Sequence, residues 1–202
     1  MKRHVTRCGW CTDDPVYIQY HDQEWGRPLH EDRLLFEFLV LEGAQAGLSW
    51  LTVLKKRQNY RRAFDYFDPG KIACYGQGKI NELFSNSGII RNRLKIKSAI
   101  ENAKAFLRIQ KEFGSFDRYV WAFVNNQPIK NRFRNHRQLP SQTPVSDAIS
   151  TDLKKRGFKF VGPTIIYAFM QAVGMVNDHT TDCFLGESNF PQFLFSSSSY
   201  QI

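Results

Sequence analysis

The chain has 202 residues, which is enough to bury a hydrophobic core in one domain or in two small lobes. Hydrophobic residues make up 42% of it and charged residues 23%, which is ordinary for a soluble globular protein. No apolar run approaches the ~20 residues that span a bilayer, and no apolar segment follows the basic first residues. We therefore expect neither a transmembrane segment nor a secretory signal.

The net charge of +9 and the pI near 9.5 indicate a polyanionic partner. Nucleic acid is favoured over a membrane surface, because no basic amphipathic anchor is evident in the chain. With no secretory signal expected, the four cysteines favour metal ligation or free thiols over disulfides.

A short basic arm, residues 1–7, is predicted to precede the folded part, which opens at Cys8. Asp13-Asp14-Pro15 is typical of a helix start, because aspartate caps free backbone N–H groups and proline suits the first turn. The helix predicted over residues 16–25 carries Tyr17, Tyr20 and His21 on neighbouring positions, and Trp25 follows one turn later.

A strong helix is predicted from about residue 31 to residue 45, with a core face formed by Leu34, Leu35, Phe38 and Leu39. Glu42 falls on its apolar face, four residues after Phe38 and three after Leu39. A carboxylate in an apolar stripe must find hydrogen-bond donors or become costly to bury. Small residues at 43–47 allow close approach to the backbone, and Ser49 is predicted to cap the next helix.

The pattern stays helical from residue 68 to residue 124. Asp68-Pro69 predicts a short helix, residues 78–84 predict another, and a long helix with a 3.6-residue apolar period runs through Ile96 to Leu107. Residues 119–124 are expected to be helical in this context. Residues 125–143 are polar and basic with no period, and we expect a surface connection there. No series of period-2 strands and no internal repeat is present, so the predicted fold class is all-α.

The segment from Lys154 to Cys183 is predicted to hold a helix pair. Ser146 is expected to cap the first helix, Gly157 and Gly162 bracket an aromatic turn, and Pro163 starts the second helix. The turn would place free backbone N–H groups and the positive end of a helix beside a basic cluster, which suits a phosphate. The alternative is an ordinary helical hairpin with a solvated basic patch.

Four residues near the two ends of the chain have the donor types of a closed tetrahedral zinc site: Cys8, His21, His179 and Cys183. A metal bound there would join the N-terminal segment to the end of the helix pair and contribute folding energy. The spacing is not that of a classical zinc finger, so the residues alone leave the alternative open of a hydrogen-bonded histidine and two buried thiols.

Aromatic residues are dense in the first fifty positions, around Glu42. They are Trp10, Tyr17, Tyr20, Trp25 and Trp50. Aromatic residues at helical spacing more often form core than bind ligands. Together with an apolar-face carboxylate and small neighbours, however, these fit a slot for a flipped nucleic-acid base, which stacks on rings and is read on its edge. No Gly-x-Ser-x-Gly motif, Walker loop or Cys–His dyad outside the metal set is present, and Cys11 and Cys74 are interpreted as incidental.

Four blocks of sequence resemble the 3-methyladenine DNA glycosylase I family: RCGWCTDDPVYIQYHDQEWG, LEGAQAGLSWLTVLKKRQNYRRAF, SGIIRNRLKIKSAIENA and LKKRGFKFVGPTIIYAFMQAVGMVNDH. The resemblance runs from about Arg7 to Cys183. It implies a fold of the helix-hairpin-helix glycosylase superfamily and an enzyme that excises 3-methyladenine from alkylated DNA in base excision repair. It also implies a glycosylase domain at 8–185 of two helical lobes, with the hairpin at about 153–174. The basic arm at 1–7 and a flexible tail at 186–202 are predicted from composition, and they match nothing in the family that would give them a function.

The resemblance assigns roles to residues already singled out. It implies structural Zn²⁺ on Cys8, His21, His179 and Cys183, base contact by Glu42, and stacking on Trp50. The other pocket residues it implies are Trp10, Tyr17, Tyr20 and Trp25. Contact with the DNA backbone is implied for the hairpin, at Lys154, Lys155, Arg156, Gly157, Lys159, Gly162 and Thr164.

Two further positions bear on the chemistry that the resemblance implies. Related hairpin glycosylases with lyase activity have a lysine just after the second hairpin glycine, and Thr164 stands there, so we predict a monofunctional hydrolase that leaves an abasic site. Many relatives use an aspartate after the second helix. Asp178 lies near that place, but this family is thought to work without it, so we give Asp178 little catalytic weight.

Two other classes compete with this interpretation. A non-catalytic binder of damaged DNA would share the basic hairpin and the zinc site, but it would not need the pocket around Glu42. A zinc hydrolase needs an open coordination position, and four protein ligands argue against one. For the glycosylase, we expect double-stranded DNA with alkylated bases as partner, no membrane, a monomer, and action on chromosomal DNA in the cytoplasm.

Overall fold

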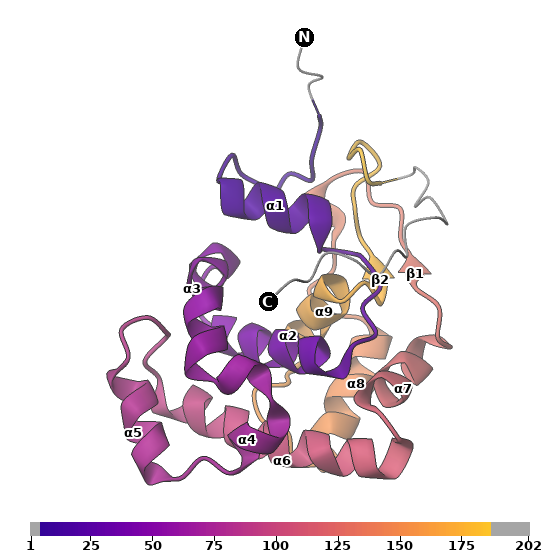
Figure 1. The fold of residues 1–202 in the computed structure, drawn as a ribbon. Coiled ribbons are helices and arrows are strands. Elements are labelled where there is room, and N and C mark those ends of the chain that lie inside the picture. Colours follow the sequence, from indigo (N-terminus) through magenta and orange to yellow (C-terminus); the bar gives the residue numbers. More distant parts are fainter. Residues whose placement is uncertain (1–4, 187–202) are drawn as a thin grey trace.

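Helices account for most of residues 5–186, the part of the chain that the computed structural model describes (Figure 1). The longer helices are α1 (Pro15–Gln23), α2 (Asp32–Gln45), α3 (Trp50–Ala63), α5 (Gln77–Ser85), α6 (Arg93–Phe113), α8 (Pro144–Lys155) and α9 (Pro163–Ala172). The shorter elements are η1 (Asp65–Phe67), α4 (Pro69–Ala73), α7 (Phe116–Trp121), η2 (Ala122–Val124), β1 (Ile129–Lys130), η3 (His136–Gln138) and β2 (Val176–Asn177). The predicted all-α class is confirmed.

Side chains cap the helices much as the sequence predicts. Asp14 accepts a hydrogen bond from the Val16 N–H at the start of α1, and Ser49 accepts one from the Thr52 N–H at the start of α3. One prediction is wrong. Thr143, and not Ser146, caps α8, because Ser146 lies one turn inside and its hydroxyl accepts the Thr143 N–H in a reciprocal capping box.

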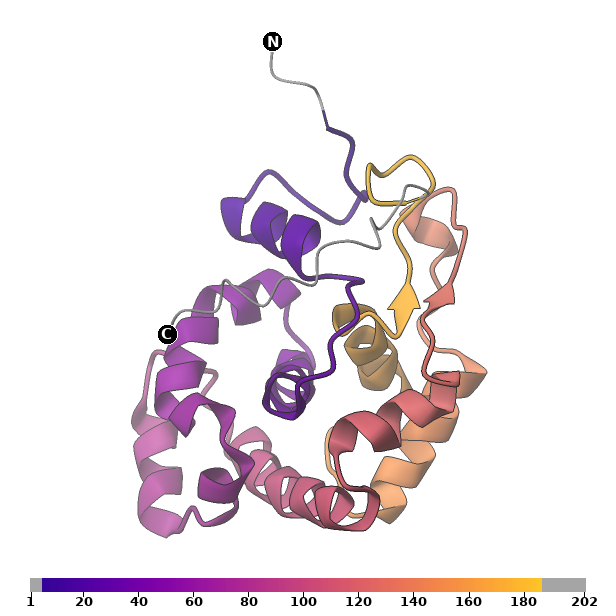
Figure 2. The same cartoon turned by 45° about the vertical axis from the view of Figure 1, so that its right-hand side comes forward.

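Helix α2 forms the centre of the core. Its residues from Leu35 to Ala44 are all buried, and it packs against α3, α6 and α9. Figure 2 shows α2 close to end-on with these helices arranged around it. A helix that is apolar nearly all round must be enclosed on every side. Glu42, on its last turn, is therefore enclosed by neighbouring elements as well.

Residues 125–143 were predicted to be a surface connection, and they also contain a short strand. Strand β1 pairs with β2 in parallel, Ile129 opposite Val176 and Lys130 opposite Asn177. Such a pairing of two-residue strands leaves no period in the sequence. It fixes the start of residues 131–141, here named the rim loop, beside the segment that follows α9.

No helix within residues 5–186 combines the length and apolarity that crossing a membrane requires. Residues 1–4 and 187–202 lie outside the described part. The predicted arm is therefore covered only in part, and the predicted tail, apart from Gly186, is not covered.

The segment after α1 crosses the end of α9 at very short range. The Gly26 N–H donates to the Gln171 carbonyl, and the Leu29 N–H donates to the Val173 carbonyl. Gly174 has a φ of +70°, and a Cβ there would lie 2.1 Å from the carbonyl carbon of Arg27. Only glycine fits both the backbone conformation and this space.

We expect Gly174→Ala to cost at least ~3 kcal/mol of unfolding free energy, since two backbone segments would have to separate and the left-handed φ adds strain. Gly47→Ala is the matched control. Gly47 has a φ of +79° but would have no atom within 4 Å of its Cβ, so only the strain of ~1 kcal/mol applies. Urea unfolding of both variants measures the difference, and equal losses would contradict the crossing as the cause.

Candidate functional site

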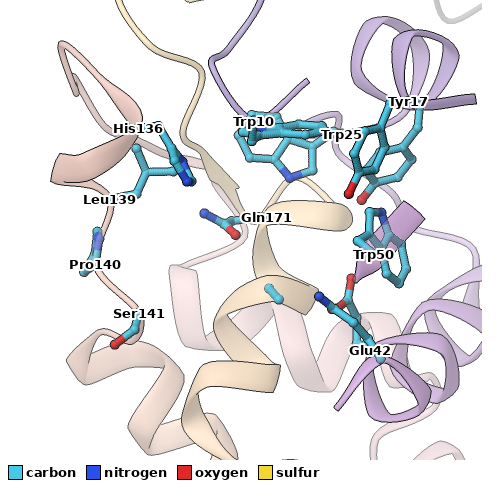
Figure 3. A pocket seen from close by; sticks show the side chains of 13 residues that line it. Trp10, Tyr17, Trp25, Glu42, Trp50, His136, Leu139, Pro140, Ser141 and Gln171 are labelled. Atoms are coloured by element: carbon cyan, nitrogen blue, oxygen red, sulfur yellow. The ribbon is translucent and has the colours of Figure 1, made fainter. Parts of the chain in front are cut away.

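A cavity of about 370 Å³ opens between the N-terminal helices and the C-terminal part of the chain (Figure 3). Its lining residues are Trp10, Tyr17, Tyr20, Trp25, Glu42, Gln45, Trp50, His136, Leu139, Pro140, Ser141, Ala168 and Gln171. All six residues predicted for a base pocket are among them. A cavity of this size and aromatic lining suits a small planar ligand.

The aromatic side chains hold one another by ring contacts. The ring centroids of Trp10 and Trp25 lie 5.0 Å apart, nearly perpendicular, and those of Tyr20 and Trp50 lie 5.6 Å apart. Such packing fixes each ring without closing the space between them. Helix α1 supplies the tyrosines because Tyr17 and Tyr20, three residues apart, share one face.

Trp50 is positioned by two hydrogen bonds at the start of α3. Ser49 caps the helix, and the Tyr17 hydroxyl accepts the Leu51 N–H at 3.1 Å. The second bond joins α3 to α1. A tyrosine of the pocket wall therefore also fixes the helix that presents Trp50 (Figure 3).

Glu42 is a buried acid with no acidic or basic partner. Its residue is 3% exposed, and within residues 5–186 its carboxyl group makes no hydrogen bond or ion pair. Burial raises its pKa to about 8. With this pKa the group is largely protonated near neutral pH. A cation bound next to it would favour the carboxylate.

The end of α2 that carries Glu42 is held by Lys95. The Lys95 ammonium, from α6, donates to the carbonyls of Ala44 and Ala46 at 2.9 and 2.6 Å. These carbonyls lie at the end of the helix, where no backbone N–H satisfies them. Burial lowers the pKa of Lys95.

Two indole N–H groups in the pocket wall are also unsatisfied. Within the described residues, the Nε1 atoms of Trp10 and Trp50 are buried and make no hydrogen bond of normal geometry. Buried donors and acceptors are normally paired, and exceptions point to strain, water or a ligand. The pocket thus offers unsatisfied donors and one carboxyl group to an incoming molecule.

The far wall of the pocket was not foreseen. It consists of His136, Leu139, Pro140 and Ser141 of the rim loop, with Ala168 and Gln171 of α9. The rim-loop residues come from a stretch with no periodic pattern. Only the tertiary pairing of β1 with β2 brings them opposite Trp50, so no local signal could have found them.

Asp178 lies behind this wall and does not line the pocket. It is 1% exposed, and its carboxylate accepts hydrogen bonds from the Tyr167 hydroxyl, Gln171 Nε2 and Asn131 Nδ2 at 2.6 to 2.7 Å. Its oxygens are occupied in joining α9 to the rim loop. This arrangement fits the low catalytic weight predicted for it.

The four predicted metal ligands come together. The donor atoms of Cys8, His21, His179 and Cys183 all lie within 4.8 Å of one another, and all four residues are buried. Cys8 Sγ lies 3.4 Å from Nδ1 of His179, and Cys183 Sγ lies 3.5 Å from Nε2 of His21. The hydrogen bond from Cys8 lowers the pKa of Cys183, and the pKa of Cys8 is correspondingly raised.

The outer contacts of both histidines fit metal binding. His21 Nδ1 lies 2.8 Å from an Asp22 carboxylate oxygen, and His179 Nε2 lies 3.2 Å from the Trp25 carbonyl oxygen. Each acceptor places the ring proton on its own side and leaves the lone pair of the other nitrogen toward the cysteines. Metal-binding histidines almost always have such partners. Asp22 and the Trp25 carbonyl were not predicted.

The predicted DNA-contact residues occupy the turn between α8 and α9. Lys154, Lys155, Lys159 and Thr164 are exposed, and Gly157 takes a φ of +96°. Arg156 differs, because its guanidinium pairs with Asp152 and Glu112 at 2.7 Å and lies over the ring of Phe113. Its DNA contact stays a prediction, and those pairs compete with it.

An aromatic, carboxyl-bearing pocket in a helical protein with exposed cations has the features that suit a nucleic-acid base held out of its helix. The methyladenine glycosylase family model matches residues 10–186. The chain is therefore a member of the methyladenine glycosylase family.

Its relatives match nearly end to end. DNA-3-methyladenine glycosylase 1 of Escherichia coli K12 is 51% identical over 93% of this chain and 100% of its own. A crystal structure of a 3-methyladenine DNA glycosylase I is 53% identical with a TM-score of 0.87, covering 89% of this chain and 99% of the other. A Staphylococcus aureus 3-methyladenine DNA glycosylase I, solved for the structural basis of 3-methyladenine recognition, is 36% identical with a TM-score of 0.88, covering 92% and 98%.

The burial of Glu42 predicts a pH dependence of stability. The folded pKa of about 8 exceeds the ordinary value of 4.5, so the folded state binds the proton more tightly, and stability falls as the pH rises from about 4.5 to about 8. One unit of pKa difference corresponds to about 1.4 kcal/mol. Glu42→Gln removes this term, and the melting temperature of the variant relative to wild type should therefore rise across that range.

Other titrating groups are common to both proteins and cancel in the comparison. Glu101→Gln, at an exposed position on α6, serves as control and should follow the wild-type profile. Parallel melting profiles for wild type and Glu42→Gln between pH 5 and pH 8.5 would show that folding does not raise the pKa of Glu42.

Proposed function

We propose that this protein is a DNA glycosylase that hydrolyses the N-glycosidic bond of 3-methyladenine in alkylated DNA, and that it does so monofunctionally, leaving an abasic site. The observation that carries the proposal is the buried Glu42 in an aromatic cavity, without a hydrogen-bond or ion-pair partner among residues 5–186, in a chain about half identical to a 3-methyladenine glycosylase over its full length.

Methylation at N3 gives the adenine ring a positive charge and weakens its glycosidic bond. The enzyme therefore needs to recognise the base more than to protonate it. The damaged nucleotide rotates out of the duplex, which costs least where pairing is already weak. Its cationic ring stacks on Trp50 and the neighbouring aromatic residues, a cation–π gain that neutral adenine lacks.

Glu42 then supplies the charge-dependent part of recognition. When the cation enters, the Glu42 carboxyl loses its proton, and the carboxylate accepts a hydrogen bond from the exocyclic amino group. Both effects favour the charged base over a neutral one. Trp10, Tyr17, Tyr20 and Trp25 exclude water from this pair, which strengthens the attraction between the two charges.

The bond between the base and C1′ breaks with its electron pair going to the base, which leaves as neutral 3-methyladenine. The sugar becomes oxocarbenium-like, water adds at C1′, and one proton is released. Thr164, at the position where lyase relatives have lysine, offers no amine for a Schiff base.

The hairpin residues Lys154, Lys155, Lys159 and Thr164, with the glycine backbone at 157 and 162, are proposed to bind phosphates of double-stranded DNA without reading sequence. We further propose a helix-hairpin-helix glycosylase domain at residues 8–185 between the arm and the tail, a monomeric enzyme, and action on cytoplasmic chromosomal DNA.

The first test incubates dimethyl sulfate-treated DNA with the protein and measures free 3-methyladenine by chromatography. Wild type should release it, and Glu42→Gln should release it at least ~30-fold more slowly, a loss of about 2 kcal/mol of transition-state stabilisation. Glu101→Gln is the charge-matched control. Wild-type protein that binds the DNA but releases no base would favour a binding module, and full activity of Glu42→Gln would remove the role given to that residue.

A zinc ion held by Cys8, His21, His179 and Cys183 is proposed as a structural cofactor. Two thiolates and two imidazoles are a usual structural zinc set, and four protein ligands leave no open position for catalysis. When bound, the ion supplies a rigid link between the N-terminal segment and the segment after β2.

Metal analysis of purified protein should find about one zinc per chain, and a strong chelator should lower the melting temperature. Asp22→Asn should weaken zinc affinity by ~10 to 100-fold while the protein still folds, because it removes the carboxylate that orients His21. Asp182→Asn, an exposed change next to Cys183, is the control. Zinc affinity unchanged by Asp22→Asn would contradict the orienting role.

A further inference from the structure

The rim loop carries a group of unpaired cations. Arg132, Arg134 and Arg137 are exposed, as is Lys130 just before the loop, and within residues 5–186 none of their side chains makes an ion pair or hydrogen bond. Many other arginines are occupied. Arg7, Arg57, Arg61 and Arg156 all pair with carboxylates. An exposed run of charge is often only solvated. Whether these cations bind a partner is therefore judged from the backbone that carries them and from its location.

The backbone of the rim loop is firmly held. The Asn131 N–H donates to the Asn177 carbonyl at 3.1 Å, and Asn131 Nδ2 donates to Asp178 at 2.7 Å. The Phe133 carbonyl accepts the Thr181 N–H at 2.9 Å.

The tip of the loop is braced internally as well. The Arg134 N–H donates to the Gln138 side chain at 2.7 Å, and the Asn135 side chain accepts the Arg137 N–H at 3.1 Å. The structure therefore fixes where each arginine leaves the backbone while leaving its side chain free. A fixed backbone with free cationic side chains is suited to a partner outside the chain.

The rim loop and the hairpin stand on opposite sides of the pocket. The rim loop forms the far wall of the pocket. The hairpin packs against the end of α2 that carries Glu42, where a Cβ on Gly43 would lie 3.3 Å from Cβ of Phe160. Gly43 follows Glu42 directly. Helix α9 links the two, from Pro163 at the hairpin to Gln171, which is bonded to Asp178 beneath the loop.

At 1.5 Å per residue this stretch of α9 spans roughly 12 Å. One strand of DNA carries a phosphate for every ~3.4 Å of helix axis. A separation of this order exceeds the spacing of neighbouring phosphates, so a strand whose damaged base enters the pocket can present one phosphate to the hairpin and another to the rim loop.

We propose that the rim loop is a second phosphate-binding surface for the damaged strand, with Arg132, Arg134 and Arg137 as its contacts and with the hairpin as the grip on the other side of the flipped base. The inference rests on the proposed function, because it takes DNA as the partner. These arginines bind phosphates irrespective of sequence, because contacts to phosphates, unlike contacts to base edges, carry no sequence information. Asp178 holds the start of this surface through its hydrogen bond with Asn131.

The test measures binding of duplex DNA containing a stable abasic-site analogue as a function of salt, for wild type and for the triple variant Arg132→Gln, Arg134→Gln, Arg137→Gln. Removing one arginine–phosphate interaction lowers the magnitude of the slope of log K against log salt by about 0.9, so a drop of about two to three is expected. The matched control is Lys71→Gln, Lys111→Gln, Arg118→Gln, which removes the same charge from α4, α6 and α7, elements that do not line the pocket. Its slope should stay within about 0.5 of wild type.

Binding of free 3-methyladenine, followed by quenching of tryptophan fluorescence, should be the same in all three proteins and shows that the pocket is intact. Equal slopes for the rim-loop variant and the control would overturn the proposal. This outcome differs from failure of the proposed function, in which wild type releases no 3-methyladenine while its salt dependence still reports on the rim loop.

Discussion

The closure of the chain on itself at Cys8, His21, His179 and Cys183 is the constraint on which the pocket depends. Cys8 and His179 are 171 positions apart in the sequence, yet their side chains lie 3.4 Å apart. Two of the cluster residues flank Trp10 in the sequence, and Trp25 lies one turn after His21. The same closure therefore sets the aromatic wall opposite α9 and the rim loop. Without it, α1 would be held over the cavity mainly by its contacts with α3.

The pocket works against the stability of the fold. Glu42 sits in the most buried helix of the core with a pKa raised to about 8, and the indole N–H groups of Trp10 and Trp50 find no partner in the described part of the chain. A sequence chosen for stability alone would place an apolar residue at position 42. A second buried acid nearby shows the contrast. Glu37, on the same helix, is equally buried, and Arg57 and Arg61 satisfy it. The difference between these two buried acids separates a structural carboxylate from one kept free for a ligand.

Local signals in the sequence predict much of this molecule. Caps at Asp14, Ser49 and Asp68 and the apolar periods of α2 and α6 act within a few residues, so the helices follow from them. The place of Glu42 on an apolar face follows from the same period. The roles of the four possible metal ligands and of the pocket residues were predicted largely from the family resemblance, since their spacing alone left other interpretations open. The rim loop could not be predicted, because two-residue strands and the three hydrogen bonds of Asp178 exist only after α9 and the segment behind it have packed.

The net charge does not show where this protein binds a polyanion. A better guide is whether each cationic side chain is already paired with a carboxylate. Of the cluster that ends α8, Arg156 is held by Asp152 and Glu112 and covered by aromatic rings, while Lys154 and Lys155 remain exposed. On α3, Arg57 is buried between Glu24 and Glu37 and serves the core. Charges fixed in this way are already neutralised and have no counterions to exchange for phosphate. Exposed cations that make no ion pair within residues 5–186 occur on several elements, and among them are those of the hairpin turn and of the rim loop, on the two sides of the cavity. That arrangement is what a protein needs if it must hold a strand on both sides of one displaced base.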